Sequence, residues 1–119
     1  MNEYAPRGLA TAGQVLWRKV VSLYSLRPDE LATLEDVCRL TDMIDKLQKA
    51  WREDDEPMTA KGSAGQLIIH PIIGELRAQR LAVNVLWRQL KLPDLDDAAE
   101  APNQHRAAVN TRYARGKAS

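Results

Sequence analysis

The chain has 119 residues, 45% of them hydrophobic and 28% charged, values typical of a single globular domain. The net charge of +1 hides a strong segregation, because residues 1–27 carry +3, residues 28–56 carry −6 and residues 57–92 carry +4. One cysteine excludes an intramolecular disulfide, no apolar run approaches the length of a membrane span, and the N-terminus lacks the apolar segment of a signal peptide. We therefore expect a cytoplasmic protein that has no membrane partner.

The first predicted helix covers residues 11–24 and follows an arm at residues 1–8, which contains Pro6 and Gly8 and is predicted to be flexible. Apolar residues recur every three or four positions, as expected on one face of a helix: Leu9, Ala12, Leu16, Val20, Leu23 and Tyr24. Only residues 25–27 separate this helix from the next one. So short a link predicts an antiparallel helical hairpin.

The long helix predicted at residues 28–51 is the central element of the chain. Pro28 suits the first helical position, and the acids that follow it lie against the positive end of the helix dipole. Two apolar stripes lie about 130° apart around the helix axis. The first stripe consists of Leu31, Leu34 and Cys38, and the second consists of Val37, Leu40, Ile44, Leu47 and Trp51. We assign the first stripe to the helix at 11–24, and the second to a third helix and a neighbouring copy of the chain, which predicts a homo-oligomer.

A short hairpin or an ordered loop is predicted between the long helix and the third helix. Acids at residues 53–56, followed by Pro57, end the long helix. Two short extended segments then flank the sequence Gly62-Ser-Ala-Gly65. Lys61 stands before these glycines, whereas a phosphate-binding loop places its lysine after them, so a tight turn is the better interpretation.

The third helix is predicted at residues 71–91, with Pro71 at its first position. Its main apolar face consists of Ile72, Leu76, Val83, Leu86, Trp87 and Leu90, and a weaker second face consists of Ala78, Leu81, Ala82 and Val85. Between these faces four cations lie within about 80° of arc and extend over roughly 21 Å. We call them the basic strip: Arg77, Arg80, Arg88 and Lys91.

The predicted fold is mainly α: a helical hairpin with one long central helix, a short β-hairpin or loop, and a third helix. Residues 9–93 form a helical core and oligomerisation domain, and residues 94–119 form a disordered tail. The tail is first acidic and then basic, and its basic part contains Arg106, Arg112, Arg115 and Lys117. Tails of this composition often hold nucleic acid electrostatically, and the alternative is a tail that only improves solubility.

Catalytic chemistry has no visible basis in this sequence. The two histidines, His70 and His105, lie far apart, and one cysteine cannot supply the ligand spacing of a zinc site. The acids at 53–56 could attract a divalent cation, but a solvated helix end is the simpler interpretation. The three tryptophans all fall on apolar helix faces, which favours core packing over base stacking. We expect no enzyme activity, no metal and no cofactor.

The basic strip has two interpretations. It can bind the phosphates of a DNA duplex. Alternatively, it pairs with acids of the long helix such as Asp42 and Asp45, within one copy or between copies.

Several segments, taken in order, resemble the small subunits of bacteriophage terminases. These are Leu16-Trp17 in the first helix, Leu26-Arg-Pro-Asp-Glu-Leu31 at the start of the long helix, Lys61-Gly-Ser-Ala-Gly-Gln66, His70-Pro71, and Leu90-Lys-Leu-Pro93 at the end of the third helix. The resemblance covers about residues 9–93, and none of its motifs is catalytic.

The resemblance implies a component of a viral DNA-packaging motor in the cytoplasm of a host bacterium. Such proteins are mostly helical, assemble into rings, recognise viral double-stranded DNA and regulate a large subunit that holds the ATPase and nuclease. An N-terminal helix-turn-helix is not evident here, so we place DNA binding on the basic strip and the tail. The alternative function is a small helical module that binds a protein helix and no nucleic acid.

Overall fold

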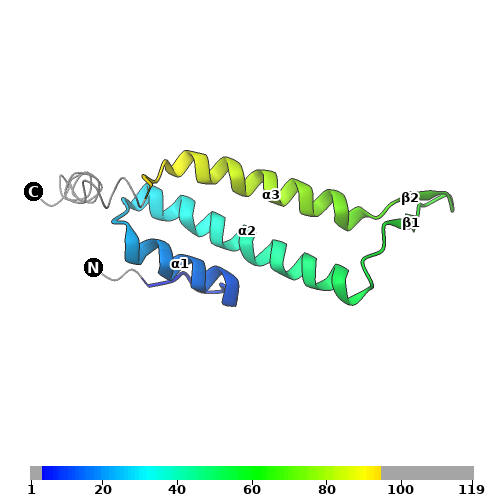
Figure 1. Ribbon diagram of the computed structural model, residues 1–119, viewed down its shortest axis with the longest axis horizontal. Helices are drawn as coiled ribbons and strands as arrows, with labels where there is room; N and C mark the ends of the chain where they lie inside the picture. Colours follow the sequence, from blue (N-terminus) through cyan, green and yellow to red (C-terminus); the bar gives the residue numbers. More distant parts are fainter. Residues whose placement is uncertain (1–3, 95–119) are drawn as a thin grey trace, which may run out of the picture.

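The computed structural model describes residues 4–94 of the chain. Three helices and a two-stranded antiparallel sheet follow one another as α1 (Thr11–Leu23), α2 (Pro28–Glu53), β1 (Thr59–Lys61), β2 (Leu67–Ile69) and α3 (Pro71–Leu90). The long helix α2 lies in the middle, with α1 along one side and α3 along the other, and the hairpin projects from one end (Figure 1). The predicted mainly helical fold is confirmed, while the prediction of disorder concerns residues that, apart from Asp94, lie outside the described part.

The start of α2 agrees with the sequence prediction, and its end lies two residues beyond the predicted one. Pro28 occupies the first turn, and the backbone N–H of Arg27 donates to Oε1 of Glu30 at 2.9 Å. At the other end, the N–H of Glu56 donates to the carbonyl of Trp51 at 2.8 Å. Asp55 and Glu56 both adopt left-handed backbone conformations, with φ of 63° and 52°. The chain bends at these two residues and continues beyond the end of α2 to the hairpin (Figure 1).

The first helix receives its N-terminal cap from α2 instead of from its own sequence. Ala10 stands at the N-cap position and has no side chain that can accept a hydrogen bond. The carboxylate of Asp42 accepts from the N–H of Ala10 at 2.7 Å and from the N–H of Gly13 at 2.6 Å. A Cβ on Gly13 would lie 2.5 Å from Oδ2 of Asp42 and 2.9 Å from the carbonyl oxygen of Cys38. Glycine is therefore required at this position, because α1 leaves no room for a side chain against α2.

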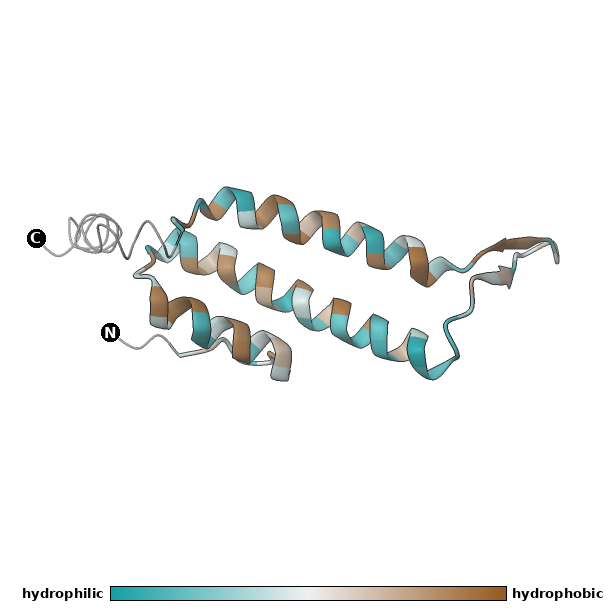
Figure 2. Ribbon diagram, in the orientation of Figure 1, coloured by the Kyte–Doolittle hydropathy of each residue, from teal (hydrophilic) through white to brown (hydrophobic). Residues whose placement is uncertain are grey.

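The hydrophobic core lies at the end of the bundle where all three helices meet. Apolar residues alternate with hydrophilic ones along each helix (Figure 2). The side chains of Leu34, Val37 and Cys38 are completely buried. The buried residues that complete this cluster are Leu9, Trp17, Val20, Leu26 and Leu90.

The two predicted stripes of α2 have different surroundings. In the first, Leu34 and Cys38 belong to the buried cluster that also contains Trp17 and Val20 of α1, as predicted. In the second, Val37 is fully buried in the core of its own chain. The other members of that stripe are half-buried and lie within about 40° of Trp51, which faces α3 across a groove: Leu40, Ile44 and Leu47. The contact of this stripe with a neighbouring copy remains a prediction, and Val37 leaves no exposed surface for it.

The hairpin pairs Thr59 with Ile69 and Lys61 with Leu67. Its turn is closed by a hydrogen bond from the N–H of Gly62 to the carbonyl of Gln66 at 2.7 Å. Gly65 adopts a φ of 82°, a conformation that favours glycine at this position of the turn. The segment 61–65 is thus a tight turn followed by a strand, which agrees with the sequence interpretation.

Candidate nucleic-acid interface

The basic strip lies on the exposed surface of α3. Arg77, Arg80 and Arg88 belong to the helix, and Lys91 directly follows it with a φ of 49°. All four residues are exposed. Heptad spacing places Asn84 between Arg77 and Arg88 on the same face, so the strip continues along the helix. Its length and charge suit a surface that follows a DNA phosphate backbone.

The acids of α2 do not neutralise the basic strip within the described residues. Asp42, the first acid considered as a partner, binds the N-terminus of α1 instead. Nη2 of Arg80 donates to the amide oxygen of Gln48 at 2.7 Å, and this partner is neutral. In the chain from residue 4 to 94, the ion pairs join Arg27 to Asp29 and Glu30, and Arg39 to Glu35. The strip therefore keeps its positive charge in a single copy.

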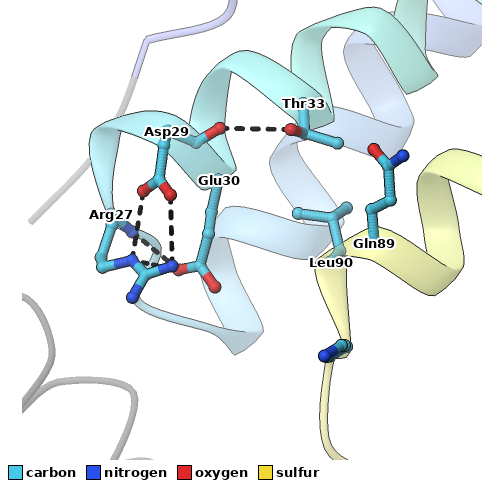
Figure 3. A pocket seen from close by; sticks show the side chains of 7 residues that line it. Arg27, Asp29, Glu30, Thr33, Gln89 and Leu90 are labelled. Carbon is cyan, nitrogen blue, oxygen red and sulfur yellow. Dashed lines mark hydrogen bonds and ion pairs between the residues drawn. The ribbon is translucent and has the colours of Figure 1, made fainter.

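At one end of the strip, Lys91 borders a shallow pocket of about 290 Å³ between the start of α2 and the end of α3. Figure 3 shows Arg27 beside Asp29 and Glu30 on one side of the pocket, and Gln89 and Leu90 on the other. Nε of Arg27 lies 3.1 Å from Oδ1 of Asp29 and 3.8 Å from Oε1 of Glu30. These two acids already share a cation, which weakens their attraction for Lys91.

At its other end, the strip borders an apolar groove between α2 and α3. The groove has a volume of about 360 Å³. Its lining consists of Trp51, Ile73, Leu76, Leu81, Arg77, Arg80 and Asn84. Arg77 and Arg80 thus stand over an apolar floor, whereas Arg88 lies outside this groove. The strip therefore has an apolar groove at one end and a polar pocket at the other.

The remaining predicted DNA-binding residues lie in the tail and outside the described residues: Arg106, Arg112, Arg115 and Lys117. The attachment of the tail is nevertheless visible. The hydroxyl of Tyr24 donates to the carbonyl oxygen of Pro93 at 2.6 Å. Burial of the Tyr24 side chain, followed by the negative charge of Asp94, raises the pKa of its phenol. This hydrogen bond fixes the last described residues against the end of α1.

The other side chains considered for chemistry have structural surroundings. Trp17 is 4% exposed and belongs to the core, while Trp51 and Trp87 are half-buried. Nδ1 of His70 accepts from the N–H of Ile72 at 3.2 Å and thereby caps α3. Among residues 4–94, no group of three or more His, Cys, Asp or Glu side chains is arranged to hold a metal ion.

Sequence reasoning missed two residues that organise this surface. Asp42 was considered a partner of the basic strip, and its role as the cap of α1 was not anticipated. Gly13 was not singled out, although a side chain there would collide with α2. The one available signal was the lack of a capping residue before Thr11, which implies that the N–H groups of α1 find an acceptor elsewhere.

Comparisons of the chain with known protein families, with curated proteins and with solved structures found no match. Within the described residues, none of the helices combines the length and the apolar character needed to cross a membrane.

Proposed function

We propose that this chain is a terminase small subunit, an oligomeric DNA-binding component of a bacteriophage genome-packaging motor. In this role it binds viral double-stranded DNA in the host bacterial cytoplasm and regulates a large subunit that carries the ATPase and nuclease. The chain itself performs no catalysis. The proposal rests on the order in which the motifs follow one another between Leu16 and Pro93, together with the helical fold in which they occur.

The observation that carries DNA binding is the positive charge of the basic strip. Three exposed arginines lie along α3 and Lys91 directly follows it, and none of the four forms an ion pair within residues 4–94. Each Lys or Arg that contacts a phosphate releases condensed counterions, so binding weakens steeply with salt. If acids of α2 had covered the strip, this observation would favour a protein-binding module.

The experiment compares DNA binding by two variants with two substitutions each. Arg88→Ala with Lys91→Ala removes two cations of the strip that lie outside the apolar groove. The matched control, Arg18→Ala with Lys19→Ala, removes two exposed cations of α1. Fluorescence anisotropy with a labelled duplex, measured over a series of salt concentrations, should show weaker binding and a salt slope reduced by roughly 2 for the strip variant only.

A third variant separates the strip from the tail. Deletion of residues 101–119 removes the basic residues that follow the described part. Loss of binding on this deletion, with normal binding by the strip variant, would assign DNA binding to the tail and reject the strip. Normal binding by both variants would reject phosphate contacts by Arg88 and Lys91 and by the deleted residues of the tail.

The apolar groove favours a second candidate function, a helical module that binds another protein. A groove lined by Trp51, Ile73 and Leu76 can accept apolar side chains of a partner. The two functions differ in the salt experiment, because a module of this kind shows no salt-dependent affinity for duplex DNA.

A further inference from the structure

The hairpin exposes large apolar side chains that nothing in its own chain covers. Leu67 and Ile69 are 74% and 71% exposed, and they lie on the same face of β2 because side chains alternate along a strand. The hairpin has only two strands, and such a unit is marginally stable in isolation. Exposed apolar side chains on a projecting element indicate a contact surface. We call this pair the hairpin knob.

The apolar groove is the complementary feature on the same chain. Trp51, Ile73 and Leu76 form part of its lining, and Leu81 at its edge is 60% exposed. Arg77 and Arg80 also line it and place two cations beside these apolar residues. A partner that fits this groove therefore brings apolar side chains for its floor and negative charge for its cations.

One chain cannot place its own knob in its own groove. The hairpin joins α3 directly through His70, and it extends away from the bundle, beyond the ends of α2 and α3 (Figure 1). The groove lies in the opposite direction, along the helix from Ile73 to Asn84. The occupant must come from another molecule.

The charges near the hairpin and near the groove indicate which molecule occupies the groove. The chain enters the hairpin through the exposed acidic turn at residues 53–56. These acids form no ion pair within residues 4–94, and neither do Arg77 and Arg80 at the groove. The hairpin itself carries one cation, Lys61 opposite Leu67, but the four acids before it give residues 53–69 a net charge of −3. The groove offers an apolar floor beside positive charge. A second copy of this chain satisfies both requirements.

We infer that the hairpin knob of one copy inserts into the apolar groove of the next, with the acidic turn of the first copy against Arg77 and Arg80 of the second. The contact joins two different surfaces, so it repeats from copy to copy and closes into a ring when the rotation permits. This inference rests on the homo-oligomer in the proposed function and specifies its contact surface. It assigns Arg77 and Arg80 to assembly and leaves Arg88 and Lys91 for DNA.

The test uses two full-length variants that damage opposite sides of the contact. The knob variant carries Leu67→Lys and Ile69→Lys, and the groove variant carries Leu81→Lys. All three positions are exposed, so both variants should keep the wild-type circular dichroism spectrum. Val15→Lys on α1, where the side chain is 41% exposed, serves as a matched surface control.

Native mass spectrometry and light scattering at micromolar concentration then give the size of each assembly. We expect an oligomer for the wild type and for Val15→Lys, and monomers for the knob and groove variants measured separately. An equimolar mixture of the two variants should form a heterodimer, because each pair retains one intact knob and one intact groove.

A knob variant that keeps the wild-type size would overturn the inference while leaving the proposed function standing. The same holds if only the groove variant dissociates, since the groove then holds another segment. A monomeric wild type would reject both the contact and the homo-oligomer of the proposed function. DNA binding by the Arg88 and Lys91 variant, measured separately, keeps the two failures distinguishable.

Discussion

The two ends of the helical bundle differ in how completely they bury their apolar side chains. At the three-helix end, where α1 lies beside residues 28–42 of α2, Leu34, Val37 and Cys38 are fully buried. At the two-helix end, beyond Asp42, Leu76 is the one buried apolar residue among the described residues, and Leu81 is 60% exposed. The cause is length, since α1 has 13 residues and α2 has 26.

This difference suggests that the three-helix end determines the stability of the fold, whereas the two-helix end serves contacts with other molecules. The three-helix end already contains a closed core, so changes there should reduce the free energy of unfolding of a single copy. The two-helix end leaves apolar surface uncovered, so changes there should affect contacts with other molecules and leave folding almost unchanged.

Replacing one leucine at each end should give the largest contrast. Leu34→Ala creates a cavity in the core and should lower the free energy of unfolding by about 3 kcal/mol. Leu81→Ala, at a position that is 60% exposed, should lower it by less than about 0.5 kcal/mol. Urea denaturation followed by circular dichroism measures both. Equal losses would show that the two ends are packed alike.

Alkaline pH should weaken the three-helix end through Cys38. Burial, then the charges of Asp42 and Glu35, raise the pKa of this thiol from 9.0 to about 11. The folded state therefore favours the neutral thiol, so its contribution is complete below the unfolded pKa of about 9 and is lost as pH rises toward 11. The loss should be on the order of 2 kcal/mol, and denaturation at a series of pH values measures it. Cys38→Val provides the control, and an unchanged slope in this variant would assign the effect to other groups.

A glycine-to-alanine change should have opposite signs at the two ends. Gly13→Ala places a Cβ against Asp42 and the backbone of Cys38, and should cost about 2 kcal/mol. Gly74→Ala in α3 meets nothing within 4 Å, and should stabilise the helix by about 0.5 to 1 kcal/mol. Thermal denaturation of both variants checks the signs. A stabilising Gly13→Ala would contradict the close approach of α1 and α2.

The cap supplied by Asp42 should have the smallest effect of the four. Asp42→Ala leaves the N–H groups of Ala10 and Gly13 without their acceptor, and should cost about 1 kcal/mol. Asp45→Ala removes an exposed carboxylate three residues further along α2 and should change stability by less than about 0.5 kcal/mol. Hydrogen exchange of the first turn of α1 locates the loss, and unchanged exchange there would reject the cap.

The elements of this fold were predictable from local signals, whereas its contacts were not. Pro28 and Pro71 mark helix starts, and apolar spacing identifies the helix faces, so the predicted bounds of the long helix fall within two residues of the observed ones. The cap on α1 joins residues 29 to 32 positions apart, and no local pattern encodes such a pair. For the same reason Val37 was assigned to a shared stripe, although the combined packing of three helices buries it.

The basic strip was predictable because it depends on periodicity along a single helix. Whether acids of α2 neutralise the strip was not predictable, because the answer depends on which groups Asp42 and Arg80 contact in the folded chain. The groove was missed because its lining comes from two helices and includes Trp51, which the sequence placed on a stripe and not beside a cavity. The role of the tail remains a prediction.

The hydrogen bond from Tyr24 to Pro93 determines at which end of the bundle the described chain ends. It places Asp94 at the end of the bundle remote from the hairpin, and the rest of the chain is attached there. In a ring with cyclic symmetry, every copy has the same orientation along the rotation axis. If the copies form the proposed ring, the segments that follow Asp94 all start on one rim. Weak phosphate contacts made by several copies there would then add up as in a multivalent ligand.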